Sequence, residues 1–276
     1  MNQSVRRIGY VLLCAFPFIA FGAAAARPLR VAGVYHVIGG VLFAAVALAV
    51  WVVGPPVIRL KEAGSGKLAF AGFLLILPWA IISLLWVGIG PPFQATLSEN
   101  YMRFLVLVWD SILVTIGFVV LNQALHEAGE RFYSSVGLAA ALAAGAAYLI
   151  CLNLSLAQVA MALHGDKTPP PAILGIFYSA IEFVACVMTY VTTAAFAAAL
   201  WRVRFLGRNA ALGYVTASAL LVLLIVMRGL EFPEISAQTA PWYTRPGVIA
   251  GIPAIPWFMP CLLGAVLLRR AGDAHP

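Results

Sequence analysis

The chain has 276 residues, of which 63% are hydrophobic and only 10% are charged. Soluble globular domains carry about 25% charged residues, and a soluble protein of this length could not shield so many apolar side chains from water. The composition therefore excludes a soluble domain and indicates an integral membrane protein. The 17 basic residues outnumber the 10 acidic ones. In a membrane protein such an excess sets the topology and contacts lipid headgroups rather than nucleic acid.

Long apolar runs separated by short charged or proline-bearing loops predict transmembrane helices, each of which needs about 20 residues. The sequence does not show the alternating strands of about 10 residues that are typical of a membrane β-barrel. We therefore predict an all-α fold, a polytopic helical membrane bundle that forms one integral membrane domain over residues 1–276 with no soluble domain. The predicted spans are 8–26, 31–54, 68–90, 104–125, 135–163, 172–201, 210–228 and 247–268.

The first span raises the question of cleavage. Residues 1–26 combine a basic start, an apolar run and an alanine-rich tail, which is also typical of a secretory signal peptide. Cleavage would leave seven spans instead of eight, with the rest of the topology unchanged. We expect the segment to be retained, because a second span follows almost immediately and Pro17 interrupts the apolar run.

The distribution of Lys and Arg predicts the orientation of the bundle. The side that carries both termini holds 11 of these residues and the opposite side holds the other 6, among them Arg103 just before the fourth span. Cytoplasmic loops are enriched in Lys and Arg, so we predict that both termini are cytoplasmic. The scarcity of lysine beside abundant Arg, Ala and Gly favours a bacterial source, and hence the inner membrane.

The last predicted span carries Pro253, Pro256 and Pro260 in its outer half. Each proline removes an intrahelical hydrogen bond, and freed carbonyls at membrane depth are tolerated only inside protein or beside a wet cavity. One interpretation is a broken helix that lines such a cavity. The other is a helix that begins only near Pro260 and follows an interfacial segment.

Asp110 lies about a third of the way into the apolar run 103–125. By helical rise we expect it about 10 Å below the outer boundary of its span. An ionisable side chain at that depth needs a partner, a proton or water. Asp110 is therefore the first candidate for a functional site.

The sixth span carries a polar stripe. Its members fall on one face of a helix because they recur at i, i+4, i+8, i+11 and i+15. Helix–helix hydrogen bonding would account for the threonines, but it explains the glutamate poorly. We expect the stripe to face the interior of the bundle, with the carboxyl of Glu182 as a ligand or proton site. The stripe consists of Tyr178, Glu182, Cys186, Thr189 and Thr193.

Further polar residues fall in the outer halves of their predicted spans: His36, Asn153, Gln158 and Arg228. Together with the two carboxyls they predict a polar cavity that opens to the outside. The alternative is an architectural ion pair between Arg228 and one carboxyl, which would fix the helix register without any ligand. The candidates for binding a ligand or a proton are Asp110, Glu182, Arg228, His36, Asn153, Gln158 and Tyr178.

Familiar motifs for metal and nucleotide binding are incomplete. HEAGE at 126–130 lacks the second histidine of the zinc motif, and GSGK at 64–67 lacks the first glycine and the Ser or Thr of a P-loop. The four cysteines lie in four different predicted spans and form no CxxC motif. We therefore expect no metal site and no cofactor, we identify no catalytic residue, and we do not favour an enzyme.

Three classes of function fit these observations. We favour a protein that binds or transports a small solute, a proton or a cation through its carboxyl groups. One alternative is a membrane-embedded enzyme that acts on a lipid or isoprenoid substrate. The other is a non-catalytic accessory or sensory subunit, for which the small residues Gly137, Ala141 and Gly145 would let a partner helix approach closely. The expected partners are membrane lipids, a small molecule or ion, and, in the last case, another membrane protein.

Overall fold

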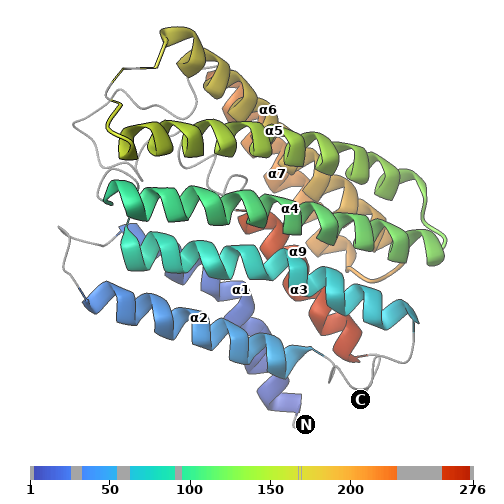
Figure 1. Cartoon of the computed structure of the whole chain (residues 1–276). Coiled ribbons are helices and arrows are strands. Elements are labelled where there is room, and N and C mark those ends of the chain that lie inside the picture. The colour runs from blue at the N-terminus through green and yellow to red at the C-terminus, as the bar shows by residue number, and fades with distance from the viewer. Residues whose placement is uncertain are drawn as a thin grey trace.

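The computed structural model describes residues 3–25, 33–54, 63–90, 95–166, 168, 170–228 and 257–273. These residues form an all-α bundle (Figure 1) and include no strand. The helices are α1 (Gln3–Ala25), α2 (Val34–Val53), α3 (Ala63–Ser83), the π-helix η2 (Leu84–Ile89) that continues α3, α4 (Leu97–Glu127), α5 (Phe132–Leu163), α6 (Ala172–Arg202), α7 (Arg208–Arg228) and α9 (Phe258–Asp273).

Within the described ranges, 7 helices are long and apolar enough to cross a membrane. They correspond to the first seven predicted spans and confirm a polytopic helical membrane protein. Of the eighth span, only the part from residue 257 onward is described. There α9 begins at Phe258, so Pro260 lies in its first turn, where the missing N–H breaks no helical hydrogen bond. This agrees with the second interpretation of that span, while residues 247–256 lie outside the described residues.

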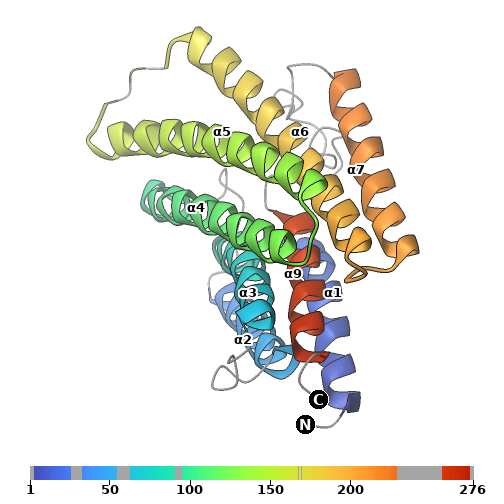
Figure 2. The ribbon, with the colours of Figure 1, turned by 90° about the vertical axis from the view of Figure 1, so that its right-hand side faces the viewer.

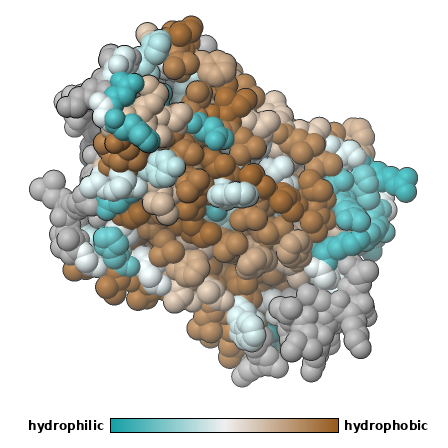
Figure 3. Space-filling model, viewed as in Figure 1, coloured by the Kyte–Doolittle hydropathy of each residue, from teal (hydrophilic) through white to brown (hydrophobic). Residues whose placement is uncertain are grey.

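The surface supports the same conclusion. Figure 3 shows a face that is largely hydrophobic across its middle, with hydrophilic residues gathered toward the two ends of the helices. Many large apolar side chains are exposed on the helices, as in Trp51 and Met227, which are 76% and 77% exposed. Side chains of this kind are favourable where the surroundings are lipid tails.

The helices follow one another in space much as they do in sequence. Figures 1 and 2 show α3, α4, α5, α6 and α7 as neighbours in turn, with α9 beside α3. The packing of α3 on α9 is close, since a Cβ at Gly72 would lie 2.8 Å from the carbonyl oxygen of Gly264. Such close approach between helix backbones requires small residues.

α5 lies between α4 and α6, and its small residues make this possible. Gly137, Ala141 and Gly145 are all buried, which confirms that this stripe supports close helix packing. Gly137 abuts the ring of Phe196 on α6, whereas Gly145 abuts Thr115 on α4. The small residues thus serve internal contacts.

Both described ends of the chain lie at the same end of the bundle (Figure 1). Arg6 donates a hydrogen bond to the carbonyl oxygen of Val53 at 3.3 Å, and Lys67 forms an ion pair with Glu127. The first contact joins the start of α1 to the end of α2, and the second joins the start of α3 to the end of α4. Figure 1 shows these helix ends on the same side of the bundle. We call this the basic end. It matches the sequence-based grouping of Lys and Arg, and its assignment to the cytoplasm remains a prediction.

α4 begins earlier than predicted. Thr96 and Glu99 form a capping box, in which Thr96 Oγ1 accepts from the Glu99 N–H at 3.3 Å and Glu99 Oε2 accepts from the Thr96 N–H at 2.7 Å. The helix therefore starts at Leu97 and not near residue 104. The apolar run marks only the part of the helix that crosses lipid, whereas capping residues set its start. As a consequence Arg103, predicted in an outer loop, lies inside α4 and is fully buried.

Candidate functional site

Asp110 occupies the middle of α4. Counting from Leu97, it lies roughly 20 Å along the helix. Its side chain is 1% exposed, and among the described residues its Oδ2 atom has no hydrogen-bond partner. It shares a helix face with Gly117, which packs against Leu75 of α3. The carboxyl group of Asp110 is therefore enclosed by helices and not by water.

Arg103 lies on the same face of α4, nearer the end opposite the basic end. Its guanidinium donates a hydrogen bond to the carbonyl oxygen of Gly90, just beyond η2, and lies 5.5 Å from the ring centroid of Trp86. These contacts attach the start of α4 to the end of η2. The sequence analysis missed this residue, although the pattern Thr-x-x-Glu at 96–99 is a capping-box signature that would have placed Arg103 within the helix.

Glu182 lies in α6 with a side chain that is 7% exposed. Its Oε2 atom has no hydrogen-bond partner within the part of the chain that the structure describes. Cys186, Thr189 and Thr193 are buried on the same face. The stripe therefore faces the bundle, as predicted, while Tyr178 at its outer end is half-buried.

Groups that can exchange a proton surround Glu182 on α5 and α6. Its carboxyl lies within electrostatic reach of the thiols of Cys151 and Cys186. It also interacts with the hydroxyls of Tyr148 and Tyr178. The backbone carbonyl of Tyr178 accepts a weak hydrogen bond from the Cys151 thiol, with an S–O distance of 3.8 Å. Glu182 therefore lies in a polar cluster at the α5–α6 interface.

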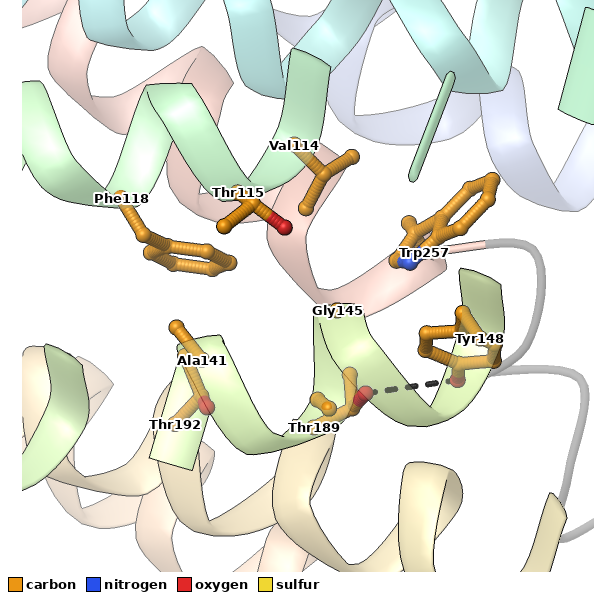
Figure 4. Close-up of a pocket in the computed structure, with 10 residues that line it drawn as sticks. Val114, Thr115, Phe118, Ala141, Gly145, Tyr148, Thr189, Thr192 and Trp257 are labelled. Carbon is orange, nitrogen blue, oxygen red and sulfur yellow. Dashed lines mark hydrogen bonds between the residues drawn. The ribbon is translucent and has the colours of Figure 1, made fainter. Parts of the chain in front are cut away.

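A small cavity lies beside this cluster, between α4, α5 and α6 (Figure 4). The hydroxyls of Thr189 and Tyr148 are hydrogen-bonded at its edge, 3.3 Å apart, and the Tyr148 ring packs edge-on against Trp257 at 5.3 Å. The cavity has room for about one water molecule. It is lined by Val114, Thr115, Phe118, Ala141, Ala144, Gly145, Tyr148, Thr189, Thr192 and Trp257.

The sequence analysis also missed Tyr148. A signal was present, because Tyr148 continues the buried stripe of Gly137, Ala141 and Gly145 at the helical spacing i+11. Within the described ranges, none of the seven predicted candidates is among the residues that line the cavity. Of the polar stripe on α6, Thr189 is the member that reaches it.

The remaining candidates lie apart from the two carboxyls. His36 on α2 and Asn153 and Gln158 on α5 are exposed. The side-chain amide of Asn153 donates to the carbonyl oxygen of Leu149 at 2.8 Å, one turn earlier in its own helix. Arg228 ends α7, and its side chain lies outside the described residues. The ion pair of Arg228 with a carboxyl is therefore still a prediction.

The segment HEAGE lies at the junction of α4 and α5. Glu127 pairs with Lys67. Glu130 accepts hydrogen bonds from the backbone N–H groups of Tyr133 and Ser134, each at 2.9 Å, and so caps the start of α5. In the described part of the chain, no group of three or more His, Cys, Asp or Glu could hold a metal ion. The residues of this motif thus have structural partners.

No protein-family model, curated protein or solved structure matches this chain. Its function is therefore inferred from the chemistry of the site. That site consists of two enclosed carboxyl groups on α4 and α6 and a hydroxyl-lined cavity between the same helices.

Proposed function

We propose that this membrane protein binds protons at Glu182 and Asp110 and uses them to move a small solute or cation across the membrane. The observation that carries the proposal is the environment of the two carboxyls. Each is buried within a membrane-spanning helix, and each has an oxygen without a hydrogen-bond partner among the described residues. We further propose that the protein lies in a bacterial inner membrane with its basic end toward the cytoplasm, as the distribution of Lys and Arg predicts.

The cost of burying a charge explains why proton binding fits this environment. An ionised carboxylate out of water costs several kcal/mol unless a cation or strong hydrogen bonds compensate it. In the described ranges the structure gives neither Asp110 nor Glu182 an ion-pair partner. A carboxyl that carries a proton avoids this cost, and one that must ionise during a transport cycle would need a path for the proton.

The two carboxyls would act as separate proton-binding groups. Asp110 shares a face of α4 with Gly117, which packs on α3, whereas Glu182 interacts with the Tyr148 hydroxyl and the Cys151 thiol of α5. Intramembrane carboxyls of this kind mark ion and proton pathways in pumps and transporters. Glu182 is the stronger candidate for the group that loads and unloads, because it is the one surrounded by exchangeable protons.

Charge movement in response to a pH jump tests the proposal. The purified protein in proteoliposomes would be adsorbed on a solid-supported membrane and exposed to rapid steps in pH, and separately to steps in Na⁺ or K⁺ concentration. Proton binding within the membrane displaces charge even when no solute turns over. We expect a transient current for the wild type, a smaller one for Asp110→Asn, and a loss of at least about tenfold for Glu182→Gln.

Empty liposomes and Glu127→Gln provide the controls. Glu127 is a carboxylate that is 47% exposed at the basic end, outside the buried region, so its removal should leave the current unchanged. A wild-type current equal to that of the double variant Asp110→Asn, Glu182→Gln would contradict the proposal. In that case the carboxyls would be architectural.

A further inference from the structure

A continuous series of exchangeable groups connects the cavity with Glu182. At the cavity, the hydroxyl of Thr189 is hydrogen-bonded to that of Tyr148 at 3.3 Å. The Cys186 thiol is fully buried on the same face of α6 as Thr189, and it interacts electrostatically with the Tyr148 hydroxyl. Cys186 lies one helical turn from Glu182 on the same face of α6, and the two side chains interact electrostatically. Each neighbour in this series can accept one proton and donate another.

The cavity is suited to a water molecule. The Thr115 hydroxyl donates to the carbonyl oxygen of Ser111, and the Thr192 hydroxyl donates to that of Met188, each at 2.8 Å. Their oxygen atoms are therefore acceptors toward the cavity, into which Figure 4 shows the side chains pointing. A buried water needs two to four polar partners and room for about one probe sphere. Both conditions are met here.

The lack of a side chain on Gly145 keeps this space open. A Cβ at this position would collide with Thr115 Oγ1. The close approach of α4 and α5 at Gly145 therefore sets the size of the cavity. It also brings the Thr115 hydroxyl of α4 toward the Tyr148–Thr189 pair, and the three residues line one cavity.

We propose that a water molecule in this cavity and the hydroxyl of Tyr148, which Thr189 holds in place through their hydrogen bond, form a relay that carries protons to and from Glu182, an inference that rests on the proposed function of Glu182. A proton that arrives on the water passes to the hydroxyl oxygen of Tyr148. The proton of that hydroxyl leaves through the thiol of Cys186 to the carboxylate of Glu182. Every relay group gains one proton and loses one, and only Glu182 ends with a proton more than before.

The described residues of α7 and α9 that pack against the Cys186 cluster include few polar groups. Ile225 on α7 and Met259 on α9 are apolar, whereas the side chain of Ser218, on the same face of α7 as Ile225, is polar and buried. Tyr214 on α7 packs against the same cluster. Among the described residues, the titratable groups around this route are Tyr148 and Cys151 on α5, Tyr178, Cys186 and Tyr190 on α6, and Tyr214 on α7.

Infrared spectroscopy of the protonated carboxyl group can measure the relay directly. The band of Glu182 would be assigned as the C=O stretch that Glu182→Gln removes. The purified protein is then transferred rapidly from H₂O to D₂O, and the shift of this band reports the rate at which the Glu182 proton exchanges with solvent. We expect exchange to slow about tenfold in Tyr148→Phe and in Thr189→Val, which corresponds to about 1.4 kcal/mol in the barrier.

Thr193→Val is the matched control. Thr193 is fully buried one turn further along α6, and its hydroxyl donates to the carbonyl oxygen of Thr189 at 2.9 Å, but it does not line the cavity. Its exchange rate should equal that of the wild type. If Tyr148→Phe fails to fold, Thr189→Val still decides the question, because valine keeps the shape of threonine and removes only the hydroxyl.

Two outcomes would overturn the relay and separate it from the proposed function. If a Glu182 band is present but both hydroxyl variants exchange at the wild-type rate, the relay is wrong while proton binding by Glu182 stands. If Glu182→Gln removes no band at any pH, Glu182 does not carry a proton, and both the relay and the proposed function of Glu182 are wrong.

Discussion

Arg103 donates a hydrogen bond to the carbonyl oxygen of Gly90 from a fully buried position in α4. The guanidinium also lies over the ring of Trp86. An arginine can bury its aliphatic stem while its planar head satisfies backbone acceptors and stacks on an aromatic face. This contact joins the start of α4 to the end of the π-helix, at the end of the bundle opposite the basic end.

Replacing Arg103 should therefore destabilise the protein. Arg103→Met keeps much of the apolar stem but leaves the Gly90 carbonyl without this donor, and an unsatisfied buried polar group costs about 1–3 kcal/mol. Arg103→Lys should lose less, because it keeps a charge and a donor but not the planar fork. The measurement is thermal unfolding in detergent, with the exposed Arg202 as the control in Arg202→Met. Equal melting temperatures for Arg103→Met and Arg202→Met would show that the contact is not structural.

A single methyl group at Gly145 should disturb both packing and the cavity. In Gly145→Ala the new Cβ collides with Thr115 Oγ1, and overpacking of this kind costs about 1–3 kcal/mol. Gly213→Ala, in α7, meets no atom within 4 Å. Alanine is the better helix former by about 0.5–1 kcal/mol in water, so this control should match or exceed the wild type in thermal stability. A Gly145→Ala protein as stable as Gly213→Ala would mean that α4 and α5 separate easily.

The cap at the start of α5 should make stability depend on pH. Burial alone would raise the pKa of Glu130, but hydrogen bonds from the backbone N–H groups of Tyr133 and Ser134 outweigh it and hold the pKa below its ordinary value of 4.5. A carboxyl whose folded pKa is depressed stabilises the protein above its unfolded pKa, and this stabilisation is lost as the pH falls through the folded pKa.

The matching variant is Glu130→Gln, which keeps the shape of the side chain and removes the charge. At neutral pH it should be less stable than the wild type by about 1 kcal/mol, the usual value of a helix cap. The difference should shrink below about pH 4, where the wild-type carboxyl becomes protonated. Thermal unfolding of both proteins across this range checks the prediction, and a difference that stays constant down to acid pH would argue against a charged cap.

The helices could be predicted from sequence because lipid imposes a simple requirement. A spanning helix must be long and apolar, so each of the first seven predicted spans coincides with a helix that meets this criterion. Helix ends follow other rules. The start of α4 depends on the reciprocal hydrogen bonds of Thr96 and Glu99, and for that reason apolar length alone misplaced Arg103.

The candidate site was harder to predict because it depends on pairs of helices. The spacing of Glu182, Cys186 and Thr189 shows that they share a face of α6, but it does not show which helix that face meets. Tyr148 completes the arrangement from α5, and its own sequence neighbourhood is apolar. His36, on the other hand, lies near the start of α2 but is exposed. Depth along a helix places a residue in the membrane, and only packing decides which way it faces.

The central claim is that the carboxyl of Glu182 takes up and releases a proton within the folded bundle. The most direct measurement is infrared absorption of protonated carboxyl groups during a pH titration between about pH 4 and pH 10, for the wild type and Glu182→Gln. We predict a C=O band in the wild type that disappears as the pH rises and is missing from Glu182→Gln at every pH. Identical spectra for the two proteins across the titration would contradict the claim.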